Sequence, residues 1–169
     1  MKTIKVTRTY LQLINKPALD FDFPDKSVKI LPVKNPTVDF YLYLYNAVGA
    51  DINWVDRNLL PKDDLEKMIC SPQVIIFVMY YQGHPAGYTE LCRENGDSIE
   101  LAYFGLLPKY RGKGLGKYLL NFTIEKAFQY YPRRLWLHTC NLDHPHALQN
   151  YIRRGFQVFD QKIVDQRVK

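Results

Sequence analysis

The chain has 169 residues, a length that favours one domain with its own hydrophobic core. With 47% hydrophobic and 24% charged residues it has the composition of an ordinary globular protein, and no apolar run approaches the roughly 20 residues of a membrane span. The formal net charge of +6 leaves nucleic acid, an anionic surface and a polyanionic small molecule open as partners.

The cysteines and the N-terminus bear on the compartment. Cys70, Cys92 and Cys140 have no C-x-x-C spacing and, being three, cannot all pair within one chain. The N-terminus lacks the apolar region of a signal peptide. We therefore expect a reducing, cytoplasmic setting and no association with a membrane.

The first 70 residues predict two strands followed by two helices. Lys2 to Ile14 alternates polar and apolar residues and Ser27 to Val33 is a second strand candidate, with a turn at Phe21 to Pro24 between them. Thr37 to Val48 carries apolar residues at helical spacing. Pro61 to Cys70 opens with proline and two acids, which is typical of the start of a helix.

The rest of the chain predicts a meander of three strands and then alternating helices and strands. The meander strands are expected at Gln73–Tyr81, Ala86–Arg93 and Ile99–Leu107, with turns at residues 82–85 and 94–97. A helix, a strand, a short helix and a last strand follow, at Leu115–Tyr131, 134–140, Pro145–Arg154 and Phe156 to about Val164. No repeat or linker divides the chain, so residues 1–169 are expected to form one domain.

A glycine-rich run, Arg111-Gly112-Lys113-Gly114-Leu115-Gly116-Lys117, joins the third meander strand to the longest helix. A strand that turns through glycines into a helix directs several backbone N–H groups at one spot, at the positive end of the helix dipole. Alternate glycines let the backbone approach a ligand closely, and the three cations add positive charge. The run therefore predicts a phosphate-binding loop.

Two common phosphate loops do not fit this run. A P-loop requires Ser or Thr after Gly-Lys, but Tyr118 follows Lys117, and a dinucleotide fingerprint requires a third glycine where Lys117 stands. The pattern Arg111-x-x-Gly114-x-Gly116 instead resembles the [R/Q]-x-x-G-x-[G/A] loop of the GNAT superfamily of N-acetyltransferases, which binds the pyrophosphate of acyl-CoA. The resemblance implies acetyl-CoA as co-substrate and residues 111–117 as part of its site.

The order of the predicted elements also resembles the GNAT core with an extra N-terminal strand. This implies an α/β fold of the α+β type, with a mixed, mostly antiparallel sheet of about seven strands flanked by about four helices. The resemblance further implies that Phe104, Gly105, Leu106 and Leu107 offer backbone groups to the pantetheine arm of the coenzyme, where the strand bulges and splays from its neighbour. Gly105 suits such a bulge, and an N–H near Leu106 is placed to stabilise an oxyanion. An ordinary core strand with a packing glycine stays open.

Two glutamates on neighbouring strands are candidates for a general base. Glu100 lies eleven residues before Arg111, the position that the resemblance assigns to the base of GNAT enzymes that use a strand glutamate. An amine such as lysine has a pKa of about 10.4 and must lose a proton before it attacks, and a carboxylate with a raised pKa can accept that proton. Glu90 is the rival, and a solvated surface glutamate is the alternative.

Tyr151 is the candidate general acid. The segment from Ala147 to Phe156 resembles the A-x-x-x-Y-x-x-x-G-F ending of the family, in which the tyrosine hydroxyl lies near the coenzyme sulfur and protonates the departing thiolate. A phenol stays protonated at pH 7 and donates a hydrogen bond. A tyrosine that packs its helix onto the sheet is the alternative.

Histidines cluster just before this helix. His138, His144 and His146 lack the paired spacing typical of zinc sites, so no metal is expected. Family members often carry an asparagine three residues before the helix alanine, where this chain has His144, and Asn141 lies further back. His144 is thus a departure from the family pattern. We expect His144 and His146 to line the acceptor mouth or the coenzyme arm, and Asn141 and His144 to belong to the coenzyme site.

A polar and aromatic loop after the first helix is the candidate acceptor site, since this region caps the acceptor pocket in the GNAT fold. It contains Asp51, Asn53, Trp54, Asp56 and Arg57. Trp54 together with the acids could hold a cationic amine through cation–π and charge contacts. It could equally fill the core, as buried aromatic residues often do.

The first hypothesis is an acyl-CoA-dependent N-acyltransferase that moves an acetyl group from acetyl-CoA to a primary amine by direct attack in a ternary complex. The acceptor would be a small-molecule or peptide amine. The alternative is a domain of the same fold that binds acyl-CoA without catalysis, as a sensor or regulatory module. Nucleic-acid binding is disfavoured because the positive charge comes with no nucleic-acid motif. A homodimer through exposed strand edges is left open.

Overall fold

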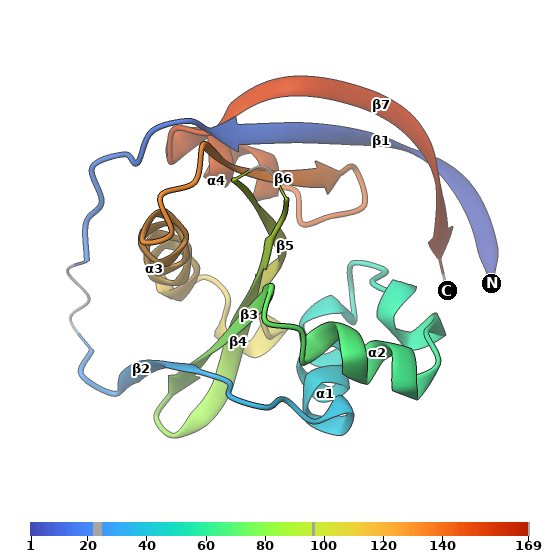
Figure 1. The fold of residues 1–169 in the computed structure, drawn as a ribbon, viewed down its shortest axis with the longest axis horizontal. Coiled ribbons are helices and arrows are strands. Elements are labelled where there is room, and N and C mark those ends of the chain that lie inside the picture. Colours follow the sequence, from blue (N-terminus) through green and yellow to red (C-terminus); the bar gives the residue numbers. More distant parts are fainter. Residues whose placement is uncertain (22–24, 96, 169) are drawn as a thin grey trace.

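The computed structural model describes residues 1–21, 25–95 and 97–168. These residues form a seven-stranded sheet with the strand order β2-β3-β4-β5-β6-β1-β7 (Figure 1). Neighbouring strands are antiparallel except for β5 and β6, which are parallel. The strands are β1 (Lys2–Leu13), β2 (Val28–Pro32), β3 (Val74–Tyr81), β4 (His84–Arg93), β5 (Ser98–Leu106), β6 (Arg134–Cys140) and β7 (Gln157–Val168).

Four α-helices and two short 3-10 helices accompany the sheet within the described ranges. They are α1 (Val38–Gly49), η1 (Asp56–Leu59), α2 (Lys62–Ile69), η2 (Pro108–Tyr110), α3 (Leu115–Phe128) and α4 (Ala147–Arg153). The predicted fold, a mixed and mostly antiparallel sheet with about four helices and a strand at the N-terminus, is confirmed. The 3-10 helices were not expected from the sequence.

The helices cover the two faces of the sheet. Figure 1 places α3 on one side of β3, β4 and β5 and places α1 and α2 on the other side. The buried residues form one cluster between α3 and the strands β1, β5 and β6, and another between α1, α2 and the strands β3 and β4. A third cluster lies between α3, η2 and the strands β3, β4 and β5. Apolar residues at helical spacing in α1 and α3 meet these clusters, which is why the sequence predicted both helices.

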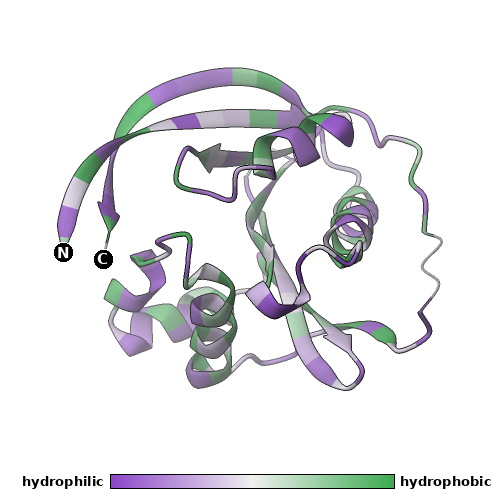
Figure 2. Cartoon of the chain, turned by 180° about the vertical axis from the view of Figure 1, so that it is seen from behind, coloured by the Kyte–Doolittle hydropathy of each residue, from purple (hydrophilic) through white to green (hydrophobic). Residues whose placement is uncertain are grey.

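The N-terminal strand lies inside the sheet and not at its edge. Strand β1 is antiparallel both to β6 and to β7, and only Arg8–Leu13 pairs with β6. The first half of β1 pairs with the last residues of β7 alone and forms with them a two-stranded ribbon, the β1–β7 ribbon. This ribbon curves over toward α1 and α2 (Figure 1), and hydrophobic and hydrophilic residues alternate along it (Figure 2).

The largest differences between the predicted and the observed element ends are at the ends of α3 and β7, whereas β4 begins two residues earlier and α4 two residues later than predicted. Helix α3 ends at Phe128, before the predicted Tyr131, because Tyr131 takes a left-handed φ of 52° ahead of a proline. Strand β7 continues to Val168 because it pairs with β1 over its whole length. The turns expected at residues 21–24 and 94–97 include residues outside the described ranges.

Strands β5 and β6 separate soon after they meet. Their pairing covers only Ser98–Glu100 of β5 against Arg134–Trp136 of β6. The expected splay is therefore present, but the bulge lies elsewhere than expected. Glu90 of β4 faces Tyr103 and Leu91 faces Leu101, so Ala102 is the extra residue on β5. An inserted residue bends its strand, and the bend carries the rest of β5 away from β6.

Gly105 has a different role from the expected bulge. It pairs regularly with Tyr88 of β4 and lies directly beneath α1. A Cβ atom on Gly105 would lie 2.6 Å from Cγ1 of Val48. The absence of a side chain therefore lets α1 pack closely on β5. Val48 and Gly105, which meet at this contact, both line a cavity.

We predict that Gly105→Ala destabilises the fold by about 1–3 kcal/mol, because the new methyl group forces α1 away from β5. Urea unfolding measures this change. Gly116→Ala is the control, since its Cβ would lie 3.5 Å from Leu106 in ordinary contact and alanine favours the helix. The control should leave the stability unchanged or slightly raised. Equal stability of Gly105→Ala and the wild type would show that α1 does not need this close approach.

Candidate active site

A cavity of about 960 Å³ opens where β5 and β6 separate. The free edge of β5 forms one wall, and the end of β6 together with α4 forms another. The glycine-rich loop and η1 with the segment before it also line the cavity, and Arg111 of the loop is hydrogen-bonded to Asp51 of that segment. The elements that the sequence connected with coenzyme, base, acid and acceptor thus meet around one space.

The glycine-rich loop is shaped as an anion cradle. Gly112 and Gly114 have φ values of 76° and 78°, and no atom lies within 4 Å of where a Cβ would stand on either residue. Gly114 immediately precedes α3, and no side chain caps the first turn of that helix. The loop residues that line the cavity are Arg111, Gly112, Gly114, Gly116 and Lys117. Backbone N–H groups at a helix N-terminus suit a phosphate group.

The three cations of the loop have different surroundings. Arg111 donates hydrogen bonds to both carboxylate oxygens of Asp51, at 2.5 and 3.0 Å, and to the carbonyl oxygen of Val48 at 3.2 Å. Arg111 therefore fastens the loop to the end of α1, and its guanidinium lowers the pKa of Asp51. Lys113 lies over the ring of Tyr81, away from the cavity, whereas Lys117 lines it.

The apolar residues and Gly105 that were predicted to lie at the coenzyme site, at the end of β5 and after it, divide into two groups. Phe104, Gly105 and Leu106 lie on the cavity wall. Leu107 packs in the hydrophobic clusters, and its N–H donates to the carbonyl oxygen of Ala86 at 2.9 Å. Leu115 is buried beneath the loop. The geometry thus brings Phe104 to Leu106 to the cavity and leaves Leu107 and Leu115 in supporting positions.

Glu100 is the last residue of β5 that pairs with β6, and it lies on the cavity wall. Its pKa is raised to about 7, chiefly because burial penalises the charged form and also because Glu94 and Glu90 lie nearby. Arg57 and Arg8 oppose this rise. A carboxyl group with a pKa near 7 can exchange a proton at neutral pH.

Tyr151 of α4 lines the same cavity. Its ring packs against Phe104 and Phe156, with ring centroids 6.3 and 5.8 Å apart. Burial raises the pKa of Tyr151, so the phenol stays protonated at neutral pH. The side chain therefore combines the packing role with a position from which a hydroxyl can act on a bound molecule.

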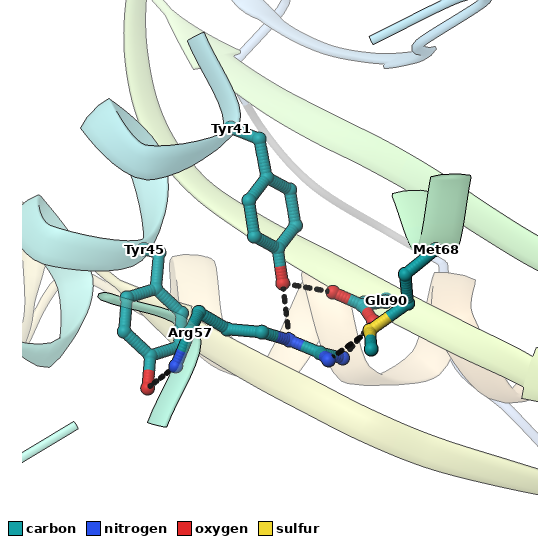
Figure 3. A network of polar contacts seen from close by, with 5 residues as sticks. All are labelled: Tyr41, Tyr45, Arg57, Met68 and Glu90. Atoms are coloured by element: carbon teal, nitrogen blue, oxygen red, sulfur yellow. Dashed lines mark hydrogen bonds and ion pairs between the residues drawn. The ribbon is translucent and has the colours of Figure 1, made fainter. Parts of the chain in front are cut away.

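Glu90 is sealed in a buried network (Figure 3). It is 1% exposed, its Oε1 lies 2.8 Å from Nη2 of Arg57, and its Oε2 accepts a hydrogen bond of 2.6 Å from the hydroxyl of Tyr41. Arg57 also donates to that hydroxyl and contacts Met68. Burial raises the pKa of Glu90 while the ion pair with Arg57 opposes the rise. Glu90 is absent from the cavity wall formed by the described residues, and it fixes η1 against β4.

The predicted acceptor residues Trp54, Asp56 and Arg57 all line the cavity. Trp54 also packs within an aromatic cluster, with its ring centroid 5.4 Å from that of Tyr45 and 4.9 Å from that of Tyr103. It therefore serves both as packing and as cavity wall. The guanidinium of Arg57 lies over the ring of Tyr103 at 5.0 Å.

The two predicted coenzyme residues before α4 differ in position. His144 lines the cavity, whereas Asn141 binds the backbone of β1, accepting from the N–H of Thr7 at 3.0 Å.

Among residues 1–21, 25–95 and 97–168 no group of three His, Cys, Asp or Glu side chains is arranged to hold a metal ion. None of the helices in these ranges combines the length and the apolar character that a membrane crossing requires.

Sequence reasoning missed several cavity residues. Arg8 of β1 and Gln166 of β7 line the cavity, and so do Tyr103, His138 and Cys140. The alternation along β1 was the available signal, because it places Arg8 on the face opposite the apolar Leu11 and Leu13. Which face looks into the cavity depends on strand register, which the sequence does not reveal.

A family model described as the acetyltransferase (GNAT) family matches residues 44–156. The chain belongs to this family. The matched range contains the glycine-rich loop, both glutamates and Tyr151. A search of curated proteins finds no match to the chain.

Solved GNAT structures share the fold at low sequence identity. A GCN5-related N-acetyltransferase from Sphaerobacter thermophilus has a TM-score of 0.69 at 15% identity, and the alignment covers 96% of this chain and 51% of that one. One from Kribbella flavida has a TM-score of 0.65 at 18% identity and coverage of 96% and 58%. The GNAT chain thus spans little more than half the length of these two proteins. A GNAT acetyltransferase from Elizabethkingia anophelis, with acetyl-CoA bound, has a TM-score of 0.62 at 19% identity and coverage of 80% of each chain.

The raised pKa of Glu100 makes a prediction about stability. In the folded protein the pKa rises from 4.5 to about 7, so the stability that the protonated carboxyl contributes is present below pH 4.5 and is lost as the pH rises through 7. Glu100→Gln removes this loss. We expect the variant to be more stable than the wild type at pH 8, by on the order of 1 kcal/mol after allowance for solvent screening, and nearly equal at pH 5.

Urea unfolding at both pH values measures this difference. Glu66→Gln, which changes an exposed glutamate of α2, is the control and should show no pH-dependent change. A gain in stability at pH 8 that persists at pH 5 would mean that packing, and not the charge of Glu100, is responsible.

Proposed function

We propose that this GNAT domain transfers an acetyl group from acetyl-CoA to a primary amine, by direct attack of the amine within a ternary complex. The observation that carries the proposal is Glu100, a carboxyl group with a pKa of about 7 in the same cavity as the glycine-rich loop. The loop suits the phosphates of the coenzyme, and the carboxyl group suits the deprotonation of an amine.

Acetyl-CoA supplies the acetyl group as an activated thioester. The N–H groups of the loop and the first turn of α3 hold its phosphates, and Lys117 adds positive charge. The free edge of β5 offers backbone groups along the splayed segment, as an added strand would require. These residues together orient the acetyl carbon toward Glu100.

Glu100 takes a proton from the amine nitrogen, directly or through one water molecule. The free amine then attacks the acetyl carbonyl, and a backbone N–H near Leu106 stabilises the negative charge that develops on the carbonyl oxygen. As the bond between carbon and sulfur breaks, the hydroxyl of Tyr151 donates its proton to the sulfur. The products are an N-acetylated amine and free coenzyme A.

Glu100 is preferred to Glu90 as the base because of their surroundings. The Glu100 side chain makes no hydrogen bond or ion pair with any residue that the structure describes, and it faces the cavity. Glu90 is bound at both oxygens by Arg57 and Tyr41. Freeing its carboxylate would leave the guanidinium of Arg57 buried without its counterion, which is costly.

Coenzyme binding is tested by calorimetric titration with acetyl-CoA. We expect Gly114→Asp to weaken binding about tenfold or more, because it places a negative charge within the anion cradle. Gly83→Asp is the matched control: Gly83 has a similar φ of 81°, also has open space around its Cβ position, and lies in the turn between β3 and β4. Equal affinities of both variants, or no binding by the wild type, would reject the loop as the coenzyme site.

Acetyl transfer is tested by the release of coenzyme A in the presence of a panel of amines. We expect kcat/KM of the wild type to rise as the pH passes through about 7, as Glu100 loses its proton. Glu100→Gln should lower kcat/KM about 100-fold and remove this rise, with coenzyme affinity intact. Glu94→Gln should only shift the midpoint to lower pH, because Glu94 helps to raise the pKa of Glu100.

Two outcomes would contradict this mechanism. Full activity of Glu100→Gln across the pH range would remove Glu100 from it. Tight binding of acetyl-CoA without coenzyme release for any amine would favour a binding domain without catalysis.

A further inference from the structure

Arg8 projects from β1 onto the cavity face of the sheet. In the register with β6 it lies opposite Cys140, and Tyr10 lies opposite His138. Leu11 and Leu13, with the other parity, pack in the core cluster beneath α3. Because side chains alternate along a strand, Arg8 lies on the opposite face from α3. This face carries the end of the cavity formed by η1 and β6.

The guanidinium of Arg8 has no partner among the described residues. Its Nε is buried without a hydrogen-bond acceptor, and no ion pair involves its side chain. Two other arginines that line the cavity are neutralised, Arg57 by Glu90 and Arg111 by Asp51, and Arg153 lines it from α4. Arg8 is therefore a cation on the cavity wall without a counterion among the residues that the structure describes.

Arg8 lies close to the proposed base. Its charge lowers the pKa of Glu100 and that of His138. It does not approach Glu100 closely enough to form an ion pair, and the pKa of Glu100 remains raised. The two groups thus face the same part of the cavity as separate charges, one able to bind a cation and the other an anion.

An unpartnered guanidinium Nε removed from water carries a desolvation cost that a bound anion offsets. The phosphates of the coenzyme are assigned to the glycine-rich loop at the start of α3, whereas Arg8 comes from β1 and lies close to Glu100 on the wall of the same cavity. Because the amine of the acceptor is placed at Glu100, an anionic group on the acceptor is the one that Arg8 would meet there.

We propose that the acceptor is an amine that also carries a carboxylate, and that Arg8 binds this carboxylate while Glu100 receives the proton of the amine. This inference rests on the proposed function. The guanidinium fork of arginine matches the two oxygens of a carboxylate. Asp56, on the same part of the wall, adds attraction for the ammonium group as the acceptor enters. An amino acid has both groups: its carboxylate pairs with Arg8, and its amine meets Glu100 and Asp56.

The test compares amino acids with their primary amides, which keep the shape and remove the negative charge. Glycine, β-alanine and lysine are each paired with glycinamide, β-alaninamide and lysinamide. We expect the wild type to favour the acid of at least one pair about tenfold or more in kcat/KM. Arg8→Gln should remove this preference by raising KM for the acid while leaving the amide unchanged, and Arg8→Lys should retain part of it.

Lys5→Gln is the matched control. Lys5 is an exposed cation on the same strand, paired with Asp165 on the surface and outside the cavity. It should leave every preference unchanged. Equal use of acids and amides by the wild type would overturn the proposal, and so would an equal loss for both members of each pair in Arg8→Gln, which would indicate a structural role.

Calorimetric titration of the same pairs into the protein saturated with coenzyme A separates this proposal from the acetyl-transfer reaction. Tighter binding of an acid than of its amide, lost in Arg8→Gln, would support the role of Arg8 even if no amine were acetylated. The absence of any acid preference in binding would overturn the role of Arg8, whatever the catalytic assays show.

Discussion

The candidate site depends on the point at which β5 and β6 stop pairing. The two parallel strands share hydrogen bonds only as far as Glu100 and Trp136, and the extra residue Ala102 then bends β5 away. The backbone N–H and C=O groups on the free edge of β5 lack hydrogen-bond partners on β6, so a molecule bound in the cavity can pair with them. Glu100 stands where pairing ends, so it is desolvated enough to hold a proton at neutral pH yet remains open to the cavity.

The buried ion pair of Arg57 and Glu90 fixes η1, which forms part of the cavity wall. It also gives the two glutamates different roles, because Glu90 is bound in the ion pair and Glu100 faces the cavity. Such a pair is weak evidence for stability, because desolvation offsets most of the attraction, but breaking it leaves a buried charge unpaired. It therefore holds η1 in one place against β4. It also neutralises Arg57, whereas Arg8 has no counterion among the described residues.

The sequence predicted the features that arise from local spacing. The glycine-rich loop, Glu100 and Tyr151 were identified through their resemblance to GNAT motifs, and the structure places all three around one cavity. The locked state of Glu90 depends on η1, a short helix without a strong sequence signal, and on Arg57 reaching across to β4. The bulge at Ala102 arises from the mismatch between two strands, and Gly105 was the more obvious but wrong position.

Strand β1 shows how one alternating sequence can serve both stability and specificity. Leu11 and Leu13 contribute to the core beneath α3, while Arg8 on the other face contributes to the cavity. A shift of the strand by one residue would exchange the two faces, exposing leucines and burying the cation. The register is fixed on both sides, by β6 along half of β1 and by β7 along nearly all of it. The insertion of the N-terminal strand between β6 and β7 therefore places Arg8 beside Glu100 as firmly as it seals the core.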